Sequence, residues 1–128
     1  MKTVVAFALV MLFAAPGQAR LGESISELKR RYGQPLDVEG TKVARINHYR
    51  FQWYSYNVTV AVREGLSVSE EFTRRDRQDF SLAEVQVLLA DSSEPGIRWV
   101  VEKGNTWKQR DRVATWSQRS LLVQDRGL

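Results

Sequence analysis

Residues 49–72 read YRFQWYSYNVTVAVREGLSVSEEF. Polar and apolar side chains alternate along this stretch, which is the period of a β-strand with one buried face. The dipeptide Glu64-Gly65 indicates a tight turn within it. The wider segment 43–75 therefore predicts three antiparallel strands. The side chains expected on their buried face are Tyr49, Phe51, Trp53, Val58, Val60, Val62, Leu66, Val68 and Phe72.

A short helix is predicted before these strands and another after them. Ser24-x-x-Glu27 is a capping box, in which the serine hydroxyl accepts from the N3 amide and the glutamate reaches back. Gly33 can adopt the left-handed conformation that ends a helix, and Pro35 prevents its continuation. Ser81-x-x-Glu84 repeats the capping pattern 57 residues later, ahead of the apolar stripe Leu82, Val85, Leu88 and Leu89.

Short strands follow the second helix as well. They are predicted over 99–101, 107–110, 113–117 and 121–124, separated by turn residues such as Lys103-Gly104-Asn105. The sequence therefore predicts an α+β domain in which a short helix packs on an antiparallel sheet. We expect an αβββ unit that is used twice, over residues 21–76 and 79–126.

The first nineteen residues have the pattern of a signal peptide. Lys2 is followed by an unbroken apolar run over 4–15 and by small residues up to Ala19. The run is shorter than the roughly 20 residues of a transmembrane helix, and no later segment is apolar enough to cross a bilayer. We therefore expect residues 20–128 to form one exported domain, periplasmic or secreted. An uncleaved anchor and a buried N-terminal helix are the alternatives.

The composition excludes several kinds of chemistry. The chain has 128 residues, a net charge of +4, no cysteine and one histidine, His48. Without cysteine there are no disulfides, thiolate nucleophiles, cysteine-ligated zinc sites or iron–sulfur clusters. We expect no cofactor and no metal. Removal of the leader takes Lys2 away, which leaves a mature net charge of +3.

The motif around the first helix resembles that of a known family. Gly22-x-Ser24-x-x-Glu27-Leu28, followed by Tyr32-Gly33-x-Pro35, is similar to the start of the SmpA/OmlA (BamE) family of small bacterial envelope proteins. The match covers about residues 21–75, because the aromatic and alternating strands follow in that family's order. Two such units in tandem resemble the β-lactamase-inhibitor-protein fold, whose concave sheet grips a partner protein. No cysteine follows the leader, so the family's lipid anchor is not expected here.

The candidate catalytic groups do not form a recognisable motif. His48 lies on a predicted strand without a nucleophile motif nearby. Glu70 and Glu71 are adjacent on a strand and point to opposite faces, so they cannot act as a carboxylate pair. Glu70 interrupts an apolar face, and an arginine partner is expected for it. We expect a protein that is not an enzyme, and a hydrolase using Glu70 with Asp79 is the remaining alternative.

Aromatic and arginine side chains are the best indication of function, since both are enriched in protein–protein interfaces. Tyr54 and Tyr56 are predicted on the face opposite Phe51 and Trp53, and a protein partner is expected there. Arginine clusters also allow a second interpretation, peripheral binding to an anionic lipid surface or polymer. Export makes a nucleic-acid partner unexpected. The candidate partner-binding residues are His48, Arg50, Tyr54, Tyr56, Arg74, Arg75 and Trp107.

The signal-peptide interpretation predicts the N-terminus of the mature protein. When the whole chain is expressed in a bacterium, we expect the purified protein to begin at Arg20, because the small side chains at Gly17 and Ala19 suit the signal peptidase. Intact-mass measurement and N-terminal sequencing test this. A product that retains residues 1–19 would favour an uncleaved anchor instead.

Overall fold

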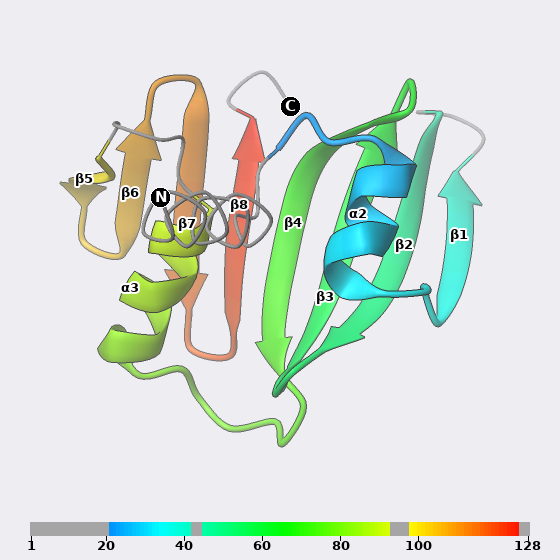
Figure 1. Cartoon of the computed structure of the whole chain (residues 1–128). Coiled ribbons are helices and arrows are strands. Elements are labelled where there is room, and N and C mark those ends of the chain that lie inside the picture. Colours follow the sequence, from blue (N-terminus) through cyan, green and yellow to red (C-terminus); the bar gives the residue numbers. More distant parts are fainter. Residues whose placement is uncertain (1–20, 42–44, 93–97, 126–128) are drawn as a thin grey trace, which may run out of the picture.

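In the part of the chain that the structure describes, two helices lie on one face of a single antiparallel sheet (Figure 1). The computed structural model describes residues 21–41, 45–92 and 98–125, and the predicted leader lies outside them. The predicted α+β class, with helices on an antiparallel sheet, is confirmed. Within this described part of the chain, neither helix has the length and apolar character needed to cross a membrane.

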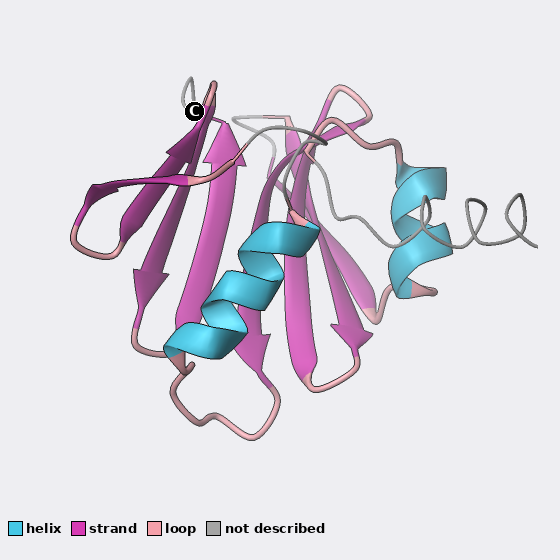
Figure 2. Ribbon diagram, turned by 60° about the vertical axis from the view of Figure 1, so that its left-hand side comes forward, coloured by secondary structure: helices cyan, strands magenta, loops and turns pink. Residues whose placement is uncertain are grey.

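The strands form two meanders that meet in the middle of the sheet. The strand order is β1-β2-β3-β4-β8-β7-β6-β5, so β4 and β8 are the central pair (Figure 1). The turned view in Figure 2 shows both helices on the same side of this sheet. A helix precedes each meander in the chain. The first set comprises α2 (Ile25–Tyr32), β1 (Asp37–Thr41), β2 (Ile46–Trp53), β3 (Tyr56–Arg63) and β4 (Leu66–Arg74), and the second comprises α3 (Leu82–Asp91), β5 (Val100–Lys103), β6 (Thr106–Gln109), β7 (Arg112–Ser117) and β8 (Ser120–Asp125).

The first half contains four strands where the sequence pattern predicted three. The additional strand is β1, which pairs antiparallel with β2 through Val38 and Tyr49. Its sequence, DVEGT, has a single large apolar side chain and a glycine, so it lacks the alternation that identified the other strands. Pairing with β2, and not local preference, is what makes this segment extended.

Both predicted capping boxes are present. The hydroxyl of Ser24 accepts from the Glu27 amide at 3.3 Å, and that of Ser81 accepts from the Glu84 amide at 3.2 Å. Gly33 ends α2 with φ +85° and ψ −164°, which favours glycine but differs from the left-handed helical conformation expected there, and its N–H donates to the carbonyl of Lys29 at 2.8 Å. The turn predicted after α3 extends into residues 93–97, which lie outside the described residues.

Rows of paired side chains across the sheet form the core beneath the helices. Phe72 on β4 pairs with Val58 on β3 and Leu121 on β8, and all three are buried. A β-bulge at Ala61/Val62 changes the register at the start of β4. As a result Leu66, predicted on the buried face, is half exposed. The remaining buried apolar residues from the helices and from the other strands are Leu28, Tyr32, Tyr49, Phe51, Val60, Val62, Val85, Leu88, Leu89, Trp107, Ala114 and Val123.

The central position of Phe72 predicts a large loss of stability on truncation. Phe72→Ala removes a fully buried ring beside the β4–β8 junction, so we expect the free energy of unfolding to fall by about 3–5 kcal/mol. Urea denaturation followed by circular dichroism measures the change. The neighbouring variant Thr73→Ala, on the opposite face of β4, should cost less than about 1 kcal/mol. Equal losses for the two variants would contradict this assignment of the core.

Candidate functional site

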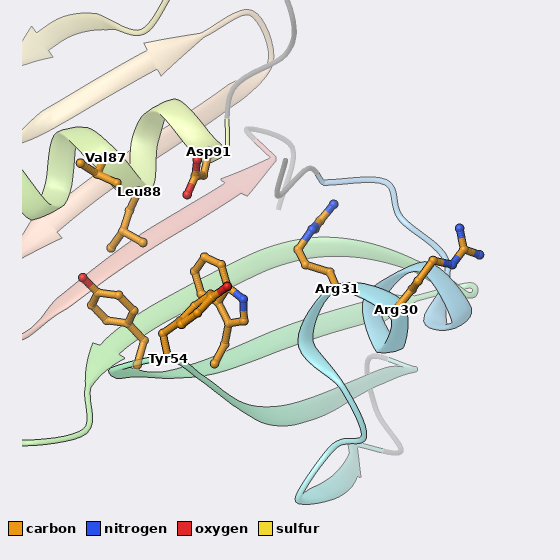
Figure 3. Close-up of a pocket in the computed structure, with 8 residues that line it drawn as sticks. Arg30, Arg31, Tyr54, Val87, Leu88 and Asp91 are labelled. Carbon is orange, nitrogen blue, oxygen red and sulfur yellow. The ribbon is translucent and has the colours of Figure 1, made fainter. Parts of the chain in front are cut away.

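A groove lies between the two helices and the tip of the β2–β3 hairpin. Its volume is about 500 Å³, and we call it the inter-helix groove. Figure 3 shows Leu88 and Asp91 pointing into it from α3, with Arg31 at the α2 end. The groove is lined by Arg30, Arg31, Trp53, Tyr54, Tyr56, Val87, Leu88 and Asp91.

A two-residue turn in the hairpin brings three aromatic side chains together. Trp53 and Tyr56 are paired across β2 and β3, so both face the helices. The prediction that Tyr56 lies on the face opposite Trp53 is therefore wrong, because the turn at Tyr54-Ser55 interrupts the strand alternation. Tyr54 occupies the turn with φ +53°, and its side chain is 79% exposed. Its ring centroid lies 4.9 Å from that of Trp53, edge to face.

Tyr56 connects the hairpin to the start of α3. Its hydroxyl donates to Oε2 of Glu84 at 3.0 Å, and Arg74 donates to Oε1 of the same carboxylate at 2.7 Å. Burial opposes ionisation of Glu84, but hydrogen bonds from Ser81, Tyr56 and Arg74 lower its pKa overall. Tyr56 and Arg74, both predicted to bind a partner, thus position α3 beside the hairpin.

The two candidate arginines near the hairpin, Arg74 and Arg75, form contacts within the chain. Arg74 forms a second ion pair with Asp76 at 2.6 Å, and this hydrogen-bonded pair lowers the pKa of Asp76 to about 2. Arg75 is exposed and donates from Nη1 to the carbonyl of Tyr54 at 3.3 Å. Tyr54, Tyr56, Arg74 and Arg75 are therefore brought together around one turn.

The remaining candidate binding residues lie elsewhere. His48 and Arg50 are on the sheet face opposite the helices, as their alternation with Tyr49 predicts. Arg50 forms an exposed ion pair there with Asp37 at 2.6 Å. Trp107, also predicted to bind a partner, is buried in the core. These three residues do not line the inter-helix groove.

A buried polar cluster lies next to the groove. Glu70, in the middle of β4, is completely buried between its paired neighbours Val60 and Val123. The hydroxyl of Tyr32 donates to its Oε1 at 3.1 Å, and Nη1 of Arg31 lies 4.0 Å from the same oxygen. Arg31 also forms a direct ion pair with Glu23. Glu70 therefore has the expected arginine partner, supplied by α2.

The surroundings of Glu70 favour its protonated form. Desolvation by burial raises the pKa of Glu70 to about 7, against the opposing effects of the Arg31 charge and the Tyr32 hydrogen bond. Burial and the negative charge of Glu70 in turn raise the pKa of Tyr32. Burial also raises the pKa of Asp91, while the charge of Arg31 opposes the shift. Arg31 thus acts electrostatically on both the buried cluster and the groove.

The predicted hydrolase pair does not share a site. Asp79 is exposed and lies 3.5 Å from Arg119, whereas the carboxyl group of Glu70 is enclosed in the core. A substrate at the surface cannot contact both groups. The buried position of Glu70 agrees with a structural role, in which it positions Arg31 and Tyr32.

Most residues of the groove and the cluster were not predicted as a site. Arg31 follows Lys29 and Arg30 in a basic run, but nothing in the pattern indicates that it turns inward toward β4. Glu23 lies just before the helix cap. Its carbonyl accepts from the backbone amide of Ser67 at 2.9 Å, and this pairing with β4 places Glu23 in a buried position. Val87 and Asp91 lie outside the apolar stripe of α3, and Leu88 was expected only as core. Val87, Leu88 and Asp91 line the same groove only because α3 lies beside the hairpin.

The architecture defines an α+β protein with an open eight-stranded antiparallel sheet that carries both helices on one face. Comparison with protein-family models finds no match, and comparison with curated proteins finds no relative. Among solved structures, the chain is similar to the crystal structure of a cysteine-rich secretory protein from Staphylococcus aureus, with a TM-score of 0.55 and 14% identity. The similarity covers 84% of this chain but 44% of that one, so this chain spans less than half its length. At this identity the likeness concerns the fold.

The raised pKa of Glu70 predicts a pH-dependent stability. The folded state holds this proton more tightly than the unfolded state, whose pKa is near 4.5. The stabilisation is fully present below pH 4.5 and is lost as the pH rises through about 7. Glu70→Gln keeps an acceptor for Tyr32 but cannot ionise. Between about pH 5 and pH 8, we expect wild-type protein to lose about 2–3 kcal/mol more unfolding free energy than this variant.

Chemical denaturation at a series of pH values measures that difference. Glu71→Gln is the matched control, because Glu71 is adjacent on β4 but points to the opposite face of the sheet. The control should follow the wild-type pH profile closely. If Glu70→Gln also follows that profile, Glu70 is ionised to the same extent in the folded and unfolded states, and the interpretation is wrong.

Proposed function

We propose that this protein is an exported, non-enzymatic binding module that recognises a partner protein through the inter-helix groove. It would act in the periplasm or outside the cell. The observation that carries the proposal is the aromatic hairpin tip, where a tyrosine with 79% exposure lies against Trp53 at the edge of the groove. Large aromatic side chains at a concave surface are typical anchors of protein–protein interfaces.

The groove offers both apolar and polar contacts to a partner. Trp53 and Tyr56 line it from the hairpin and Val87 from α3, and the charged side chains of Arg30, Arg31 and Asp91 line it as well. Val87 is 62% exposed, so its apolar surface is open to a ligand. Burial of such apolar surface, together with a few polar contacts that fix orientation, supports specific binding.

Binding to an anionic lipid surface or polymer is less well supported. That function requires arginine side chains that can release counterions from an anionic surface. Arg74 instead bonds to Asp76 and Glu84, and Arg50 to Asp37. These carboxylates compensate the charge of two of the candidate arginines, so we favour a protein partner.

We also propose that the chain resembles the SmpA/OmlA family and that its two halves are an internal repeat. Support for a repeat comes from the shared order of elements, a capped helix followed by a four-stranded meander, in both halves. The unit would then be αββββ and longer by one strand than the αβββ unit expected from the pattern. Two such units meeting at β4 and β8 would create the groove between their helices.

Site-specific photo-cross-linking tests the proposed function in cells of the source bacterium. A benzophenone amino acid at position 54 places the reactive group at the groove, and we expect one specific protein adduct because Tyr54 is exposed there. The adduct is identified by mass spectrometry. Tyr54→Ala, which leaves the core intact, should reduce co-purification of the same partner about tenfold or more.

The matched control carries the benzophenone at Val100, which is 61% exposed on the edge strand β5. We expect this position not to yield the Tyr54 adduct. The proposal is wrong if both positions give the same adducts, or if the partner that co-purifies with wild-type protein binds Tyr54→Ala equally well.

A further inference from the structure

The charges around the inter-helix groove are unequal. Arg30 and Arg31 line its α2 end, and Asp91 is the acidic residue among the lining side chains. Arg75 adds a third guanidinium beside the hairpin, where it donates to the carbonyl of Tyr54. Arginines therefore lie at the α2 end of the groove and beside the hairpin turn, and aromatic and aliphatic side chains make up most of the remaining lining.

The accessible cations are those at the rim. Arg31 is mostly buried, and its charge is shared with Glu23 and Glu70. Arg30 and Arg75, in contrast, are exposed. Figure 3 shows Arg30 on the outer side of α2, farther than Arg31 from the side chains of α3. An incoming ligand would therefore meet Arg30 and Arg75 first.

The middle of the groove suits an apolar side chain. The rings of Trp53 and Tyr56 have centroids 6.4 Å apart, and Val87, which lines the same groove, is 62% exposed. Asp91 is one carboxylate in the same groove, against the two exposed arginines Arg30 and Arg75 at its rim.

We propose that the groove binds an acidic, apolar peptide segment of the partner protein. An apolar side chain of that segment packs between Trp53 and Val87, and flanking carboxylates pair with Arg30 and Arg75. This inference rests on the proposed function, because it specifies the chemistry of the partner at the same site. Rim charges of this kind contribute to specificity and to the association rate, and salt screens them.

Selection from a random peptide library tests the chemistry without knowledge of the partner. The library is displayed on phage and selected on the immobilised chain, and clones that also bind Tyr54→Ala are removed. We expect the remaining peptides to combine Asp or Glu with Trp, Phe or Leu. A synthetic copy of the most enriched peptide, labelled with a fluorophore, then serves as the probe for affinity measurements.

Charge reversal tests the role of the rim arginines. The double variant Arg30→Glu plus Arg75→Glu should weaken binding of the probe about tenfold or more, and raising the salt from about 50 to 300 mM should weaken wild-type binding. Both side chains are exposed, so the fold should be retained. Lys108→Glu is the matched control, because Lys108 is exposed on the opposite sheet face, and it should leave the affinity unchanged.

The outcomes separate this inference from the proposed function. Enriched peptides that need Tyr54 but are basic or uncharged would overturn the acidic ligand and leave the groove as the binding site. Acidic peptides whose affinity survives the double reversal would also overturn it. If no peptide requires Tyr54 and the cross-linker at position 54 gives no specific adduct, both the inference and the proposed function are wrong.

Discussion

The antiparallel pairing of β4 with β8 joins the two meanders into one sheet. Both helices must then pack on the same face, because the row formed by Phe72 and Leu121 gives a continuous apolar surface across the junction. The helices do not cover this surface completely. The space between them, bounded by the β2–β3 hairpin, is the inter-helix groove, so the proposed binding site depends directly on the central strand pair.

Glu70 lies in this central pair and places a polar group where the core is otherwise apolar. A buried carboxyl group costs free energy unless hydrogen bonds and charges compensate it. Tyr32 and Arg31, adjacent residues at the end of α2, provide that compensation. Buried ion pairs add little net stability. We infer that this cluster instead determines how α2 sits on the sheet, and so the position of one wall of the groove.

The hairpin turn has a comparable effect on the other wall. A two-residue turn at Tyr54-Ser55 keeps Trp53 and Tyr56 on the same face, and Tyr56 then reaches Glu84 at the start of α3. Glu84 also completes the capping box of that helix. One carboxylate thus helps to begin α3 and holds the helix beside the hairpin. The exposed ring of Tyr54 remains available for binding because the turn directs it away from the core.

The sequence alone was enough to predict the features that depend on neighbouring residues. The alternation in β2 and β3, both capping boxes and the glycine that ends α2 all follow from interactions over a few residues. The face of Tyr56 depends on the local turn at Tyr54-Ser55, which the alternation did not mark. Strand β1, the buried position of Trp107 and the meeting of Arg31 with Glu70 were decided by the tertiary structure. Each depends on a contact between distant segments, and strand pairing and core packing set such contacts without a local pattern that marks them.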